Sequence, residues 1–254
     1  MTIPIPNEAV LFAFLLAMVR GGAWVAIAPP FSAVPMPIMV KASVAASLAM
    51  IAVPHIPSSQ VPLDFNGMMA AIVLQVLIGS LLGIVTLTLF SAVGAAGSFI
   101  DMFGGIVLPP SLDPLSENQL PIIGQFYNLL ALALLFASGG YELLVEGWVK
   151  SFSGTGLSLS SLRLTSTVLT SDLASFFVSA IEIAAPLLVV LFAAQVVMGM
   201  IAKAAPQANV FLLAFPFQVG LTLLFVGLGI DLLPVAVTNL VERAVHDSLT
   251  VVGV

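Results

Sequence analysis

Side chains that could carry out chemistry are few and scattered in this chain. The 254 residues include 2 His and no Cys. His55 lies in a proline-rich stretch and His246 near the C-terminal end, and neither belongs to a metal-ligand spacing such as HExxH. The motifs GxSxG, GxxxxGK[ST] and GxGxxG do not occur either. The sequence therefore predicts no catalytic, metal-binding or cofactor site, and no cofactor.

Three charged residues interrupt long apolar stretches, namely Arg20, Glu182 and Asp231. A charge at the centre of a bilayer costs at least about 2.5–3.5 kcal/mol on insertion scales, so each needs an explanation. Arg20 and Asp231 stand beside glycine or proline, so either they lie at a helix end and reach water or they have partners inside the protein. Glu182 lies one turn before Pro186, which favours a position facing protein or water.

The overall composition is that of a membrane protein. Apolar residues make up 60% of the chain and charged residues 7%, against about 45–50% and about 25% in soluble domains. The chain has 6 Lys+Arg against 12 Asp+Glu and no basic run, which excludes the electrostatic basis of nucleic-acid binding. The first apolar stretch lacks the positive start of a cleavable signal peptide, so we expect it to stay in the mature protein.

The apolar pattern predicts an all-α membrane protein with about six helical segments, forming a single membrane domain over residues 1–254. About 20 apolar residues cross a bilayer, and stretches near that length cover residues 9–28, 38–53, 65–100, 122–141, 173–202 and 209–237. The third stretch is longer than one span needs, so it is either one tilted helix or two segments. Residues 151–171, rich in Ser, Thr and Gly, are expected to form a polar linker.

A short turn is expected between the last two segments. The sequence KAAPQAN contains Lys203, Pro206 and Asn209, and proline in so short a connection ends the preceding helix. The last two segments should therefore form a helical hairpin.

Small residues recur along the third segment, at Gly79, Gly83, Gly94 and Gly97. Glycines four residues apart let two membrane helices approach closely. The predicted role is helix packing, with a helix of the same chain or of another subunit as the two alternatives.

The stretch over residues 101–121 breaks the helical pattern while staying partly apolar. Its helix-breaking residues include Gly104, Gly105, Pro109, Pro110, Asp113 and Pro114. Irregular backbone at membrane depth is tolerated only where protein buries it or where it lines an aqueous cavity. We therefore expect a gate or plug loop, the alternative being an ordinary connector outside the bilayer.

Two stretches carry a resemblance to a known family. GAAGSFIDMFGGIVLPPSLDPLSENQLPIIGQFYNLLALALLFASGGYELLVEGWVKSF, over residues 94–152, and AKAAPQANVFLLAFPF, over residues 202–217, are similar to FliR, an export-gate component of type III secretion systems. Residues 20–54 also fit the opening of that family. The chain departs from the family pattern at Gln75, Tyr141 and Gln218, where Glu, His and Lys are usual, and it lacks a proline expected shortly after residue 152.

The resemblance implies a fold, a location and partners. FliR-like chains have FliP-like helices in front, here residues 1–150, and a FliQ-like hairpin and tail, here residues 172–254. They lie in the bacterial inner membrane and join FliP-like and FliQ-like subunits in the gate through which unfolded flagellar subunits are exported. FlhB-like and FlhA-like proteins are neighbours, and the loop at residues 101–121 would face the pore.

Other functions stay open at the level of sequence. A virulence injectisome uses a homologous subunit, although LPPSLDPLSENQLPIIG favours the flagellar branch. The charged residues Glu182 and Asp231 within apolar segments, together with interrupted helices, would also suit a small-solute transporter or channel. A membrane enzyme would need a catalytic cluster that this sequence does not contain.

Overall fold

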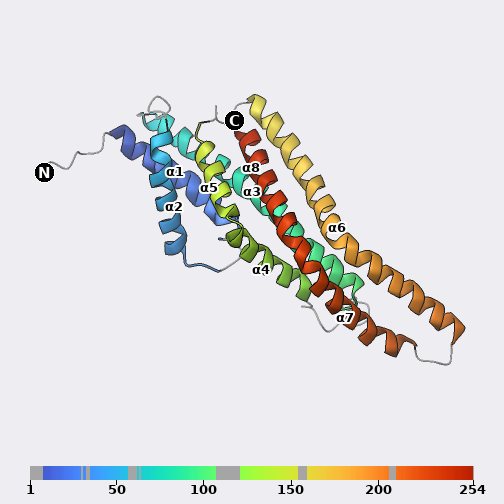
Figure 1. Cartoon of the computed structure of the whole chain (residues 1–254). Coiled ribbons are helices and arrows are strands. Elements are labelled where there is room, and N and C mark those ends of the chain that lie inside the picture. Colours follow the sequence, from blue (N-terminus) through green and yellow to red (C-terminus); the bar gives the residue numbers. More distant parts are fainter. Residues whose placement is uncertain are drawn as a thin grey trace, which may run out of the picture. The chain divides into compact units, whose positions relative to one another are not determined.

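A computed structural model describes residues 8–29, 31–32, 35–56, 62, 64–106, 121–153, 159–205 and 210–253 (Figure 1). These residues form α-helices and short 3-10 turns, with no strand among them. The prediction of an all-α protein is confirmed. Of the expected hairpin turn, Lys203 is described and exposed, whereas Pro206 and Asn209 lie outside the described residues.

The first half of the chain follows the apolar pattern closely. Helices α1 (Glu8–Ile27) and α2 (Ile38–Ala52) match the first two predicted segments, and the 3-10 turn η1 (Val53–His55) follows α2. Helix α3 (Phe65–Phe103) is a single helix of 39 residues, which settles the choice between one segment and two. Its internal glycines do not break it, because its neighbours pack against them, as shown below.

The predicted segment at residues 122–141 matches a helix except in its last four residues. Helix α4 (Ile122–Ala137) ends earlier, the chain bends at Ser138 and Gly139, and α5 (Gly140–Lys150) follows. Gly139 has φ +72°, a left-handed conformation that glycine adopts without steric cost. The sequence therefore places the helix end correctly but misses the helix that starts directly after it.

Most of the stretch at residues 151–171, where we expect a polar linker, is helical. Helix α6 (Leu159–Ala204) has 46 residues and includes most of it. Serine and threonine are poor helix formers but are tolerated near a helix N-terminus, so a polar composition does not exclude helix there. Helix α7 (Val210–Gly229), the 3-10 turn η3 (Ile230–Leu232) and α8 (Leu233–Val252) complete the chain. The sixth predicted segment is thus divided at η3.

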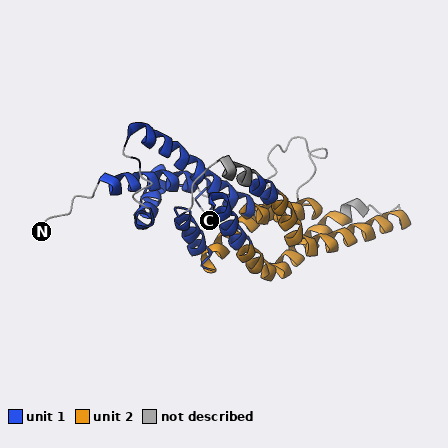
Figure 2. Ribbon diagram, turned by 90° about the horizontal axis from the view of Figure 1, so that it is seen from above, with its two compact units in different colours: residues 1–89, 139–173, 240–254 blue, residues 90–138, 174–239 orange. Residues whose placement is uncertain are grey.

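The chain folds into two compact units, each drawn from distant parts of the sequence (Figure 2). Unit 1 comprises residues 1–89, 139–173 and 240–254, and unit 2 comprises residues 90–138 and 174–239. Trp24, Leu82 and Trp148 are buried in unit 1, and Tyr127 and Leu191 in unit 2. The single membrane domain expected for residues 1–254 stays a prediction, and each unit is described by itself below.

The described helices suit a membrane. Five of them are long and apolar enough to cross a bilayer, or six when α4 and α5 are taken as one bent span. Many large apolar side chains on them are exposed, for example Ile38, Met39 and Val189. The prediction of about six apolar helical segments is confirmed, and their exposed faces need lipid or partner proteins around them.

Candidate functional site: two buried polar junctions

The first polar junction surrounds Arg20 in unit 1. This residue of α1 is only 4% exposed. Its Nη1 donates to the carbonyl oxygen and to the hydroxyl oxygen of Ser151, each at 2.9 Å, and its Nε donates to Gln75 Oε1. The guanidinium also lies 3.9 Å from the centre of the Phe152 ring. Of the two alternatives for Arg20, partners inside the protein are therefore the correct one.

The Arg20 junction fastens three elements together. Arg20 belongs to α1, Gln75 to α3, and Ser151 follows the last residue of α5. The partners of Arg20 are neutral oxygens and an aromatic face, and no carboxylate pairs with it among the described residues. Hydrogen bonds from a charged group are strong at low dielectric, and several of them fix the positions of the elements they join. Arg20 is thus a structural centre of unit 1.

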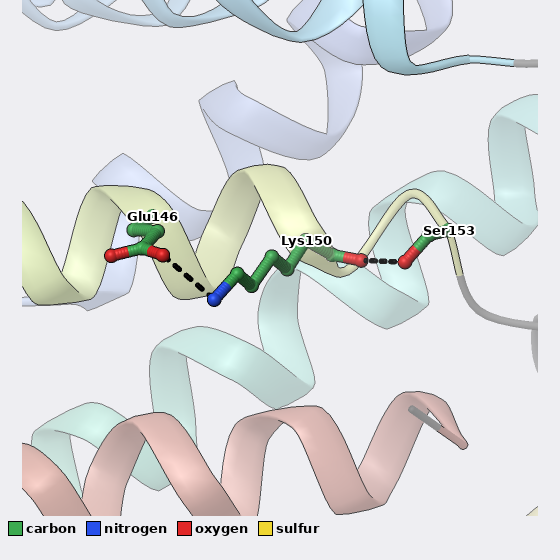
Figure 3. Close-up of polar contacts among 3 residues, drawn as sticks. All are labelled: Glu146, Lys150 and Ser153. Atoms are coloured by element: carbon green, nitrogen blue, oxygen red, sulfur yellow. Dashed lines mark hydrogen bonds and ion pairs between the residues drawn. The ribbon is translucent and has the colours of Figure 1, made fainter.

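An exposed ion pair on α5 contrasts with the buried hydrogen bonds of the Arg20 junction. Lys150 Nζ lies 2.7 Å from Glu146 Oε1, and both side chains are more than half exposed (Figure 3). The Ser153 hydroxyl donates to the Lys150 carbonyl oxygen at 2.7 Å. Exposed pairs of this kind contribute little to stability, so α5 is held by its buried face and by the Arg20 junction.

Gly79 and Gly83 bring α3 against α1 next to this junction. A Cβ atom on Gly79 would overlap the Arg20 carbonyl oxygen and lie 2.9 Å from Ala23 Cβ, and one on Gly83 would lie 2.9 Å from Ile27 Cβ. The structure therefore places the small face of these two glycines on a helix of the same chain.

A methyl group at Gly79 should destabilise unit 1. We expect Gly79→Ala to lower the free energy of unfolding by about 1–2 kcal/mol, because the backbone of α1 must move away. Gly22→Ala is the matched control, since a Cβ on Gly22 meets nothing within 4 Å, and it should stabilise the helix by about 0.5–1 kcal/mol. Thermal unfolding of both variants in detergent compares them, and equal midpoints would contradict the close α1–α3 packing.

The second polar junction surrounds Asp101 in unit 2. Asp101 lies in the last turn of α3 and is fully buried. Its Oδ1 accepts a hydrogen bond from the Ile123 amide at 3.1 Å, and its Oδ2 accepts one from the Gly124 amide at 2.9 Å. The first amides of a helix lack partners within it, and a negative charge there is favourable. Asp101 thus caps α4, whose own N-cap residue, Pro121, offers no side-chain cap.

The predicted gate loop starts and ends at this junction. The prediction starts the irregular stretch at residue 101, which is too early, because residues 101–103 are still helical. Gly104 and Gly105 end the helix, and Gly105 has φ +69°, which favours glycine. Pro109, Pro110, Asp113 and Pro114 lie outside the described residues. Since Asp101 binds residues 123 and 124, both ends of the intervening segment are held together.

The end of α3 is also bound by the last two long helices of unit 2. The Phe103 carbonyl oxygen accepts hydrogen bonds from Gln195 Nε2 of α6, at 2.9 Å, and from Gln218 Nε2 of α7. This carbonyl is one of those that a helix end leaves without a partner. A Cβ atom on Gly104 would lie 2.6 Å from Thr222 Oγ1, so α7 packs tightly there.

Gly94 and Gly97 pack α3 against α4 in the same unit. A Cβ atom on Gly97 would lie 2.7 Å from Gly124 Cα and 2.7 Å from the Ile123 carbonyl oxygen. A Cβ atom on Gly94 would lie 3.1 Å from Asn128 Cγ. Both glycines therefore adjoin a helix of this chain, and Gly97 lets α3 reach the segment that Asp101 caps.

The other two buried-charge candidates lie at the surface of unit 2. Glu182 is exposed on α6, and the described residues provide no ion pair for it. Its neighbours Val178, Ile181 and Val189 are exposed too, so Glu182 is a single carboxylate on an apolar face. Asp231 is exposed in η3, at a break between helices, as the helix-end alternative requires.

The described residues show no arrangement that would bind a metal ion. No group of three or more His, Asp or Glu side chains comes together in them. His55 and His246 are both exposed. The polar residues around Arg20 and Asp101 bind backbone, amide and hydroxyl groups of the same chain. This arrangement can hold helices to one another, and the long apolar helices that carry it are those of a multi-pass membrane protein.

Comparison with known proteins identifies the family. The family model described as "Bacterial export proteins, family 1" matches residues 11–244. The flagellar biosynthetic protein FliR of Bacillus subtilis (strain 168) is 28% identical over 252 residues, which cover 95% of this chain and 96% of that protein. FliR of Escherichia coli (strain K12) is 27% identical over 210 residues, covering 82% and 80%. The surface presentation of antigens protein SpaR of Shigella flexneri is 28% identical over 143 residues, covering 54% and 53%.

The chain belongs to the bacterial export proteins, family 1. The resemblance to FliR that its sequence indicated is confirmed.

Proposed function

We propose that the chain is a subunit of the flagellar protein export gate in the bacterial inner membrane. With FliP-like and FliQ-like subunits it forms the channel through which unfolded flagellar subunits leave the cytoplasm, beside FlhB-like and FlhA-like proteins. The observation that carries this proposal is the match of residues 11–244 to the export family. A conduit subunit needs helices that assemble, not a catalytic site, and the protein performs no reaction itself.

The share of each relative that aligns with this chain favours a flagellar export apparatus over an injectisome. The FliR proteins of Bacillus subtilis and Escherichia coli align over 96% and 80% of their lengths, whereas SpaR of Shigella flexneri aligns over 53%. An injectisome subunit is therefore the second candidate.

The exposed face around Glu182 supports assembly with other subunits. A lone carboxylate among exposed valine and isoleucine side chains is costly in lipid. A partner subunit that covers this face with a hydrogen-bond donor removes that cost. In the proposed assembly, α1 to α5 are the FliP-like part, and α6 with α7 forms the FliQ-like hairpin. A Cβ atom on Gly229 of α7 would lie 3.0 Å from Leu187 Cδ1 of α6, which supports close pairing of the two arms.

The test is recovery of the partners. The full chain, tagged and extracted from native membranes in mild detergent, should bring FliP-like and FliQ-like subunits with it, identified by mass spectrometry. Recovery of injectisome subunits instead would favour the second candidate. Solute transport by the purified chain alone in liposomes would contradict the proposal and support a small-solute transporter.

The gate role of the loop has its own test. Deleting residues 107–114, which keeps Asp101, Gly104 and Gly105, should leave the export complex assembled but make the membrane leaky to ions, because the segment proposed to close the pore is shortened. Ion leak is measured in cells that express the complex. A deletion of equal length at residues 56–63 is the control. An assembled complex with a tight membrane would show that the loop is an ordinary connector.

A further inference from the structure

A buried indole in unit 1 has a donor without an acceptor. Trp148 of α5 is 2% exposed, and its Nε1–H has no hydrogen-bond partner among the described residues. The ring is held between aromatic neighbours, with centroids 6.4 Å from Trp24 and 5.1 Å from Phe152. A buried donor without an acceptor loses the full hydration of its N–H group, so native proteins nearly always pair it.

A small cavity adjoins this indole. The volume open to a water-sized sphere is about 10 Å³. This is close to the minimum of about 10–15 Å³ that one water molecule needs. Its size excludes lipid chains and metabolites. Gly147 and Val245 form part of its wall, and a Cβ atom on Gly147 would lie 3.0 Å from Val245 Cγ1. Glycine at position 147 therefore keeps this region from being filled.

Two hydroxyl groups line the same cavity. The Thr86 hydroxyl donates to the Leu82 carbonyl oxygen at 2.8 Å, so its oxygen still has a lone pair that can accept. Ser248, on α8, is buried and also lines the cavity, and its side chain carries the second hydroxyl. Together with the indole N–H these groups give three polar partners, within the two to four that a buried water molecule uses.

We propose that one ordered water molecule occupies this cavity and bridges Trp148, Thr86 and Ser248. It accepts from the indole N–H and donates to the hydroxyl oxygens. The bridge links α5, α3 and α8. It also adjoins the Arg20 junction, because the Ser151 hydroxyl that binds Arg20 donates to the Trp148 carbonyl oxygen at 2.6 Å.

Indole magnetic resonance of the full chain tests the proposal. The chain has 2 Trp, so ¹⁵N-labelled protein in lipid nanodiscs gives two indole N–H signals, and Trp148→Phe assigns them. The Trp148 indole proton should show a cross-peak to a long-lived water molecule. Thr86→Val combined with Ser248→Ala should abolish this cross-peak and move the Trp148 signal.

The control is Thr222→Val in unit 2, which removes a buried threonine hydroxyl with the same bond to a carbonyl four residues back. It should leave the Trp148 signal and its water cross-peak unchanged. Absence of the cross-peak in the unsubstituted chain would overturn the proposal, and so would a cross-peak that survives the double substitution. If the double variant fails to fold, a density map of the unsubstituted chain decides, with a peak within hydrogen-bond distance of Trp148 Nε1 as the expected result.

Discussion

Arg20→Ala should lower the free energy of unfolding by about 3 kcal/mol. Hydrogen bonds to charged groups contribute about 1.5–3 kcal/mol each, and this substitution removes the three that Arg20 makes to Gln75 and Ser151. The free energy of unfolding falls by less than the sum of these three contributions. The reason is that burying a charge without a carboxylate partner is unfavourable, and the variant no longer buries one. Alanine also leaves the buried Ser151 carbonyl without the guanidinium and leaves a cavity beside Phe152.

Thermal unfolding in detergent measures this effect, and two further variants interpret it. Arg20→Lys keeps the charge but loses the planar, forked donor geometry and the stacking on Phe152, so it should recover only part of the stability. Arg243→Ala removes an exposed arginine of α8 and should change stability by less than about 0.5 kcal/mol. If Arg20→Ala behaves like Arg243→Ala, the junction does not hold α1, α3 and α5 together.

The Arg20 junction also explains a departure from the family pattern. Gln75 stands where the resemblance implies Glu, and the structure places this residue on Arg20 Nε. A side-chain oxygen at position 75 can accept a hydrogen bond from the guanidinium whether the residue is Gln or Glu. Among the described residues no carboxylate pairs with the guanidinium, so hydrogen-bond geometry and the Phe152 ring hold the cation.

Helix positions could be predicted because the bilayer sets the length of an apolar segment. Helices α1 and α2 follow directly from that length. Helix α5 was missed because Glu142, Glu146 and Lys150 end the apolar run. A signal was present, since Gly140, Leu144, Gly147 and Trp148 are its buried residues and have the spacing of one helical face. The mean hydropathy of a window of residues does not detect this periodic pattern.

The polar junctions could not be predicted, because they join residues far apart in the chain. Arg20 and Ser151 are separated by 131 positions, and no local pattern connects them. In the sequence, Asp101 stands only at the start of an irregular stretch. A helix that begins after proline, with no side chain of its own to cap it, was an available signal that another residue supplies the acceptor, but that residue cannot be chosen without the fold.

Asp101→Ala should lower the free energy of unfolding by about 3 kcal/mol and loosen the start of α4. Two charge-assisted hydrogen bonds are lost, worth about 1.5–3 kcal/mol each, while the cost of burying the carboxylate is removed. The amides of Ile123 and Gly124 are then left without an acceptor in a buried environment. Hydrogen–deuterium exchange should therefore become faster at residues 121–124, in addition to a lower unfolding midpoint.

Asp64 provides the matched control. Its Oδ2 accepts a hydrogen bond from the Gly67 amide at 2.8 Å, so it caps the helix that directly follows it. Because this cap is local and exposed, Asp64→Ala should cost about 1 kcal/mol and affect only the start of α3. Asp101 instead caps a helix that starts some 20 residues later, so its loss also removes the hydrogen bonds that join the two ends of the intervening segment.

This difference connects the stability of unit 2 to the proposed gate. If the segment between α3 and α4 closes the export pore, Asp101→Ala should make the membrane leaky to ions while the complex still assembles, and Asp64→Ala should not. Asp101→Asn keeps one carbonyl acceptor and should fall between the two in both measurements. An Asp101→Ala complex that exchanges faster at residues 121–124 but stays tight would confirm the cap and refute the gate. Unchanged exchange would refute the cap itself.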